Sequence, residues 1–291
     1  MKFAETLFEI ARNDLEASKC LFERELYPQA VFYLQQSVEK ATKSFGLLND
    51  VIKEEELKNV VGHNPLKVYK KSIENQEEKI ERITDAIEKV PKLGETKLIK
   101  DFNFRNYHKK IAESLTWFGS LDEVKEEILF IQKSELRSAI QELDNIESEL
   151  ESLQGININS NEELLKESLE EYKKASMEIL DAFYEFSPQK IEKVKEDLYK
   201  NKILDLNLMK EMIKAIQSAP IKNAIYVTYS LLYLSLIMLP HALVTRYPDN
   251  NHDPLKIYNK NLPLIQLFGN MVEIMEKTLS KLENLLTESR G

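Results

Sequence analysis

The chain has 291 residues, of which 43% are hydrophobic and 31% are charged, and its formal net charge is −9. A chain of this length and hydrophobic content can bury a substantial core, which argues against a disordered protein. The negative charge argues against a protein that coats nucleic acid non-specifically, because that mode depends on many Lys and Arg side chains. Glycine and proline are few, with seven and nine residues, so we expect an all-α protein.

Two features bear on the location of the protein. The single cysteine, Cys20, cannot form an intramolecular disulfide, and residues 1–17 carry charges where a signal peptide would be apolar, so we expect a cytoplasmic protein. No charged residue occurs between Lys222 and Arg246, and this stretch is nearly long enough to span a bilayer. Its tyrosines, together with Pro240, favour a buried core helix, and we expect no membrane association.

The first predicted elements form a helical hairpin. Apolar side chains recur at helical spacing over residues 3–22, Tyr27-Pro28 interrupts the pattern, and a second helix continues to about Leu48. Two further helices are predicted over residues 65–90 and 95–118.

A decapeptide occurs twice in the chain. Residues 62–71 read GHNPLKVYKK and residues 251–260 read NHDPLKIYNK, with six identical positions. The recurrence favours two related halves, with chance as the alternative because the match is short. Asn64 and Asp253 are favoured N-cap residues, and proline follows each at the first helical position. Each copy is therefore predicted to begin a helix.

The middle of the chain has heptad spacing. Apolar residues alternate steps of four and three on both sides of the polar break at residues 155–160. This pattern predicts an antiparallel coiled-coil hairpin over residues 121–186, which could project as an arm. A new helix is predicted to begin at Ser187-Pro188, and the last helix is predicted over residues 263–287.

Three N-terminal motifs resemble the HEPN domain family. They are ARNDLEAS at residues 11–18, QQSVEKATK at residues 35–43, and the His-x-x-Leu step at residues 63–66. The string TRYPD at residues 245–249 is similar to one that precedes the last helix in that family. The resemblance implies a HEPN-like helical bundle.

We therefore predict three segments. Residues 1–120 form a HEPN-like bundle, residues 121–186 form the antiparallel coiled-coil hairpin, and residues 187–291 form a second bundle. Two architectures stay open. Either each half is a divergent HEPN-like bundle, which the repeat favours, or the C-terminal helices complete the N-terminal bundle around a long insertion.

The resemblance also implies a candidate site. HEPN proteins that cut RNA use an arginine followed four to six residues later by a histidine, and Arg246 and His252 satisfy this spacing. Such an imidazole takes a proton from a ribose hydroxyl while the guanidinium stabilises the phosphorane, so we expect no metal and no other cofactor. The family usually has a polar residue after the arginine, where this chain has Tyr247. Arg105 and His108 are a second candidate pair with shorter spacing. Both pairs are also compatible with structural roles at helix ends or on a charged helix face.

Two functions follow from these features. The first is a HEPN-like protein that binds RNA or a nucleotide and acts as a metal-independent endoribonuclease, as a homodimer. The alternative is a non-catalytic interaction protein that dimerises and docks a protein partner, such as a nucleotidyltransferase, through the helical arm. Apart from these motifs, the sequence contains no Gly-rich phosphate loop and no serine-nucleophile elbow.

Overall fold

The computed structural model describes residues 2–101, 104–121, 125–152, 162–216 and 218–289. These residues contain helices and turns and no strand, so the predicted all-α class is confirmed for the part of the chain described. In chain order the helices are α1 (Lys2–Glu23), α2 (Tyr27–Leu48), the π-helix η1 (Leu57–Val61), α3 (Leu66–Lys89), α4 (Pro91–Glu95), α5 (Lys97–Asp101), α6 (Phe104–Ser120), α7 (Lys125–Leu129), α8 (Lys133–Ser152), α9 (Glu162–Ala182), the 3₁₀-helix η4 (Tyr184–Phe186), α10 (Pro188–Tyr199), α11 (Leu206–Ile216), α12 (Ala219–Met238), α13 (His241–Val244), α14 (Pro254–Ile257), α15 (Pro263–Gln266) and α16 (Phe268–Glu288).

The chain divides into two compact units. Unit 1 comprises residues 1–73, 115–151 and 219–291, and unit 2 comprises residues 74–114 and 152–218. Both ends of the chain therefore contribute to one unit. This division differs from the three consecutive segments expected from the sequence. The choice between the two architectures that the sequence left open stays a prediction.

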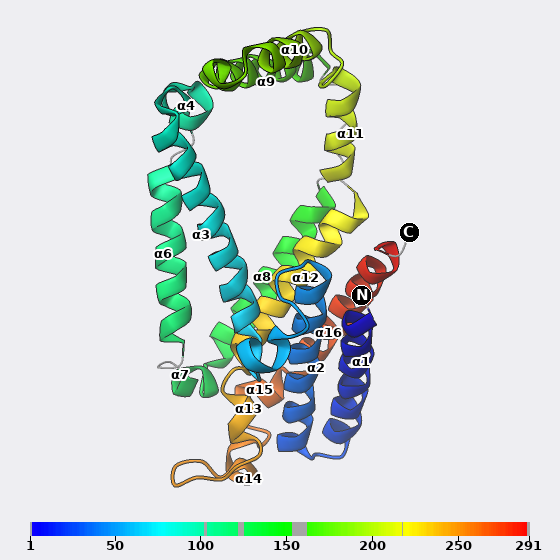
Figure 1. Ribbon diagram of the computed structural model, residues 1–291. Coiled ribbons are helices and arrows are strands. Elements are labelled where there is room, and N and C mark those ends of the chain that lie inside the picture. The colour runs from blue at the N-terminus through cyan, green and yellow to red at the C-terminus, as the bar shows by residue number, and fades with distance from the viewer. Residues whose placement is uncertain (1, 102–103, 122–124, 153–161, 217, 290–291) are drawn as a thin grey trace. The chain divides into compact units, whose positions relative to one another are not determined.

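Helices α1 and α2 form a hairpin (Figure 1), and a seam of small residues holds the two helices together. Alanine and serine face one another at three levels, spaced seven residues apart on each helix. At each level the serine hydroxyl donates a hydrogen bond to a carbonyl oxygen of the opposite helix: Ser18 to Ala30 at 2.8 Å, Ser37 to Ala11 at 2.7 Å and Ser44 to Ala4 at 2.7 Å. Short side chains allow close approach of the two helices, and the hydroxyls satisfy their hydrogen-bonding capacity inside the interface.

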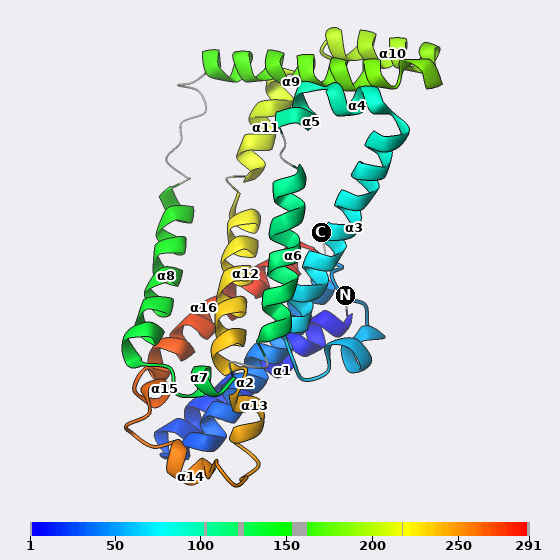
Figure 2. The same ribbon diagram turned by 90° about the vertical axis from the view of Figure 1, so that its left-hand side faces the viewer.

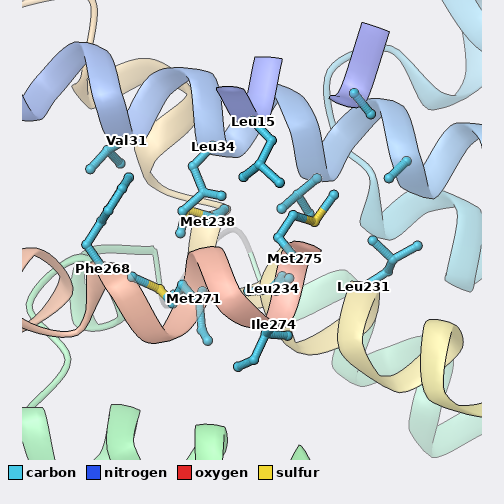
Figure 3. Packing of buried hydrophobic residues seen from close by; sticks show 14 of the residues in the cluster. Leu15, Val31, Leu34, Leu231, Leu234, Met238, Phe268, Met271, Ile274 and Met275 are labelled. Carbon is cyan, nitrogen blue, oxygen red and sulfur yellow. The ribbon is translucent and has the colours of Figure 1, made fainter. Parts of the chain in front are cut away.

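The core of unit 1 lies between α2, α12 and α16 (Figure 3). Leu34 of α2, Leu234 of α12 and Met271 of α16 have no exposed surface, and Phe268 stacks on Phe22 of α1 with ring centroids 4.2 Å apart. Helix α12 is apolar on all sides because it packs against neighbours on several faces. By length and composition α12 could also cross a membrane, but half of its most apolar window is buried within the protein.

Both decapeptides begin a helix, as predicted. The Asn64 side chain accepts a hydrogen bond from the Leu66 N–H at 3.0 Å, and the Asp253 side chain accepts one from the Leu255 N–H at 3.1 Å. The helices differ in length, since α3 has 24 residues and α14 has four. Leu66 is buried whereas Leu255 is 77% exposed, so the second copy lacks the apolar contact that anchors the first.

The two helices of the predicted hairpin over residues 121–186 belong to different units. Helix α8 belongs to unit 1, and its residues Leu136, Ile140 and Leu143 are buried in the main core. Helix α9 belongs to unit 2 (Figure 2), where it packs on α4, α10 and α11. The heptad positions of α8 are thus used for core packing within unit 1. The polar break at residues 155–160 lies outside the described residues.

Candidate functional site

A cavity of about 230 Å³ opens on unit 1. Four apolar residues line part of it: Val61, Leu239, Ala242 and Leu243. The other lining residues are His63, Asn64, Lys67, Lys125 and Arg246. No carboxylate is among the lining residues that the structure describes, so the cavity combines an apolar wall with nitrogen donors. Such a lining favours an anionic ligand.

The turn between η1 and α3 places the first of these donors. Gly62 adopts a φ of +58°, which side chains other than glycine rarely tolerate, and its N–H closes η1 on the Leu57 carbonyl at 3.2 Å. His63 follows this turn directly, and the Asn64 cap then begins α3, with Lys67 in its first turn. The first decapeptide therefore builds one side of the cavity.

Arg246 reaches the cavity from the segment after α13. Its Nε donates to the Ala242 carbonyl at 2.9 Å, and its guanidinium carbon lies 5.0 Å from the ring centre of Phe32 and 5.1 Å from that of Tyr247. Two aromatic rings thus hold the guanidinium through cation–π contacts. Among the residues that the structure describes, no carboxylate lies within ion-pairing distance of Arg246, so its charge is available to a ligand.

His252, the predicted partner of Arg246, is not among the residues lining this cavity. Its Nδ1 lies 3.0 and 3.1 Å from the two carboxylate oxygens of Asp249, and its Nε2 lies 4.0 Å from Glu126. The hydrogen bond from His252, with a further one from the Asn251 N–H, lowers the pKa of the Asp249 carboxyl. The imidazole therefore stands between two carboxylates.

The second predicted pair lies on α6 in unit 2. His108 is exposed on this helix, while the side chain of Arg105 lies outside the described part of the structure. The two residues share the helix, as expected.

His63 is not one of the site residues predicted from the sequence, because no arginine precedes it at the family spacing. In the structure, Arg246 and His63 line the same cavity although they lie far apart along the chain. A residue of the HEPN-like motif at residues 35–43 also lies beside His63. The Glu39 side chain is 4% exposed, and its Oε1 lies 3.5 Å from His63 Nδ1 and 2.7 Å from Lys43 Nζ. A spacing rule within one segment could not find this pairing.

Comparison with known proteins supports the family assignment over part of the chain. The HEPN domain family matches residues 4–96. A Methanocaldococcus jannaschii protein named "Putative toxin MJ1304" is 33% identical over 95 residues, which are 33% of this chain and 60% of that protein. This chain thus spans 60% of the length of the curated relative that it matches. No solved structure matches the chain. The HEPN identity that the N-terminal motifs predicted is therefore confirmed for residues 4–96.

Proposed function

We propose that this protein binds RNA at the cavity of unit 1 and cuts it without a metal ion. The observation that carries this proposal is the convergence of Arg246 with His63, Lys67 and Lys125 on one cavity free of lining carboxylates among the described residues. The HEPN match supports the choice of RNA, because the family includes ribonucleases. The relative named as a toxin is compatible with it, since RNA cleavage is one way to harm a cell.

In this proposal, Arg246 is the main residue that binds a phosphate of the RNA. A guanidinium donates two parallel hydrogen bonds to phosphate oxygens, and it stays protonated throughout the working pH range. Its contacts with Phe32 and Tyr247 fix the group before RNA binds, which lowers the entropy lost on binding. In the transition state the phosphorane carries more negative charge than the ground state, so the same group contributes to the rate as well as to affinity.

The test uses the full chain and a short single-stranded RNA of mixed sequence in the presence of EDTA. We expect cleavage that leaves 2′,3′-cyclic phosphate ends, and Arg246→Ala should lower the rate by about 100-fold or more. Arg12→Ala is the matched control, because Arg12 is half-exposed on α1 and pairs with Glu9 away from the cavity. Cleavage that requires a divalent metal, or an Arg246→Ala protein as active as wild type, would contradict the proposal.

The alternative of a non-catalytic protein that docks a partner through a helical arm has less support. That interpretation relied on an arm formed by the hairpin of residues 121–186. The apolar face of α8, within this segment, is occupied by the core of unit 1.

A further inference from the structure

The cavity contains one histidine among its lining residues, and that residue is His63. We infer that His63, oriented by the buried carboxylate of Glu39, takes the proton from the ribose 2′-hydroxyl of RNA bound beside Arg246. This inference rests on the proposed function and names the base of that site. It replaces His252, the histidine that spacing along the chain selects.

Glu39 is held in place from three sides. Its Oε1 accepts a hydrogen bond from Lys43 Nζ at 2.7 Å, and its Oε2 accepts longer bonds from Gln35 Nε2 and Gln36 Nε2, each at 3.5 Å. Its side chain is 4% exposed, so the carboxylate has little freedom to turn towards water. A fixed carboxylate beside one imidazole nitrogen is the arrangement that selects the tautomer of a catalytic histidine.

The imidazole of His63, in contrast to the Glu39 carboxylate, is open to solvent. Its side chain is 82% exposed, while Nδ1 lies 3.5 Å from Glu39 Oε1. This distance is long for a hydrogen bond, and such contacts commonly shorten when substrate binds. With Nδ1–H directed to the carboxylate, Nε2 is the basic nitrogen, and the open cavity gives a substrate hydroxyl access to it.

His252 is less suited to this role. Its side chain is 16% exposed, and each of its ring nitrogens faces a carboxylate, Asp249 at Nδ1 and Glu126 at Nε2. A phosphate that approached Nε2 would meet the negative charge of Glu126. His63 is faced by a carboxylate at one nitrogen only among the described residues.

The reaction balances without a metal or a second reactant. His63 Nε2 takes the proton of the 2′-hydroxyl, and the 2′-oxygen forms a bond to phosphorus. The bond between phosphorus and the 5′-oxygen of the next nucleotide breaks, and that oxygen takes a proton from water that enters the open cavity. The resulting hydroxide removes the proton from His63. The products are a 2′,3′-cyclic phosphate and a free 5′-hydroxyl.

The deciding experiment compares His63→Ala with His252→Ala on the same single-stranded RNA in EDTA. We expect His63→Ala to lower the cleavage rate by about 100-fold or more while RNA affinity changes by only a few-fold. Added imidazole should restore part of the rate to His63→Ala, which a purely structural defect would not allow. His252→Ala should keep the wild-type rate.

A His63→Ala protein that cuts as fast as wild type, or loss of cleavage in His252→Ala alone, overturns this inference and leaves RNA cleavage by the protein intact. A wild-type protein that cuts no RNA overturns the proposed function as well.

Glu39→Gln tests the positioning role of the carboxylate. Glutamine keeps the size of the side chain and removes the charge that favours the imidazolium formed during the reaction. We expect kcat to fall by about 10-fold or more with KM little changed, because Glu39 is buried behind His63 and has no place on the RNA-facing surface. A rise in KM at constant kcat would contradict this role. The unfolding midpoint of each variant, compared with that of wild type, separates these outcomes from loss of folding.

Discussion

The Tyr258 hydroxyl lies 2.6 Å from His241 Nδ1, and both side chains are buried in unit 1. Tyr258 comes from the second decapeptide and His241 from the start of α13, so this bond fixes the end of the short helix α14 to the start of α13. Burial lowers the pKa of the His241 imidazole to about 3, because the charged form would lose its hydration without gaining a counter-charge. The histidine is therefore neutral in the folded protein near neutral pH.

We predict that the stability of the protein falls as the solution is acidified below about pH 6.5. The unfolded chain binds a proton at His241 with an ordinary pKa of 6.5, whereas the folded chain does so only near pH 3. Between these values the unfolded state holds more protons, and the free energy of unfolding should fall by about 1.4 kcal/mol per pH unit from this residue. The contribution is fully present above pH 6.5.

The measurement is chemical denaturation at a series of pH values, for wild type and for His241→Gln. The free energy of unfolding of the variant should depend less steeply on pH between pH 6.5 and 4, because its residue 241 does not titrate. An NMR titration of the wild-type imidazole provides a second check that does not depend on the variant. A midpoint near 6.5 for His241 in the folded protein would contradict the prediction.

Gly46 should not tolerate a side chain. A Cβ at this position of α2 would lie 2.7 Å from Val68 Cγ1 and 3.2 Å from two atoms of Ile52. Both neighbours are buried, and a β-branched valine has little rotamer freedom. Gly46→Ala should therefore lower the free energy of unfolding by about 1–3 kcal/mol, in spite of the better helix propensity of alanine.

Gly269 is the matched control for this substitution. It lies in the first turn of α16, and a Cβ there would meet no atom within 4 Å. Gly269→Ala should leave the protein as stable as wild type or raise its stability by up to about 1 kcal/mol. Urea denaturation measures the change in the free energy of unfolding of each variant. Equal changes for the two substitutions would show that the contact with Val68 is unimportant.

Local chemistry predicted much of the fold. The N-cap and proline pairs at Asn64 and Asp253 gave helix starts that the structure confirms, and the interruption at Tyr27-Pro28 marks the start of α2. Periodicity alone could not say what an apolar stripe packs against. The stripe of α8 reads as a coiled-coil seam, but it is used in the core of unit 1. A pattern of this kind predicts which face of a helix is buried, but it does not predict which element that face packs against.

The candidate site shows the same limit at longer range. Arg246 was found because a family motif places it near a histidine in the sequence. His63 and Arg246 come together only because both ends of the chain build one unit. The seam between α1 and α2 was also missed, since its alanines and serines are too small and too polar to produce a hydrophobic pattern. A search for small residues repeated every seven positions on both helices would have found it.

The serine hydroxyls of this seam should each stabilise the hairpin by about 1 kcal/mol. Ser37 has no exposed surface, and its bond to the Ala11 carbonyl is lost in Ser37→Ala. The levels are roughly 10 Å apart along the helix, so combining this change with Ser18→Ala and Ser44→Ala should give nearly additive losses. Ser148→Ala is the control, because Ser148 is exposed and bonds only within its own helix. Thermal or urea denaturation in which Ser37→Ala matches Ser148→Ala would rule out this role for the seam.

The two decapeptides offer an internal control for the electrostatics of RNA binding. Lys67 in the first copy lines the cavity, whereas Lys256, at the equivalent position of the second, lies 3.4 Å from the Asp253 carboxylate. If Lys67 contacts a phosphate, Lys67→Ala removes one ion pair with RNA, and fewer counterions are released on binding. The slope of log affinity against log salt should then become shallower by about 0.7, the value for one contact with a single strand. Lys256→Ala should leave the slope unchanged, because its charge is already balanced by Asp253. Binding titrations of wild type and both variants over a series of salt concentrations measure the slopes, and an equal change in the two variants would mean that general surface charge, rather than the cavity, attracts the RNA.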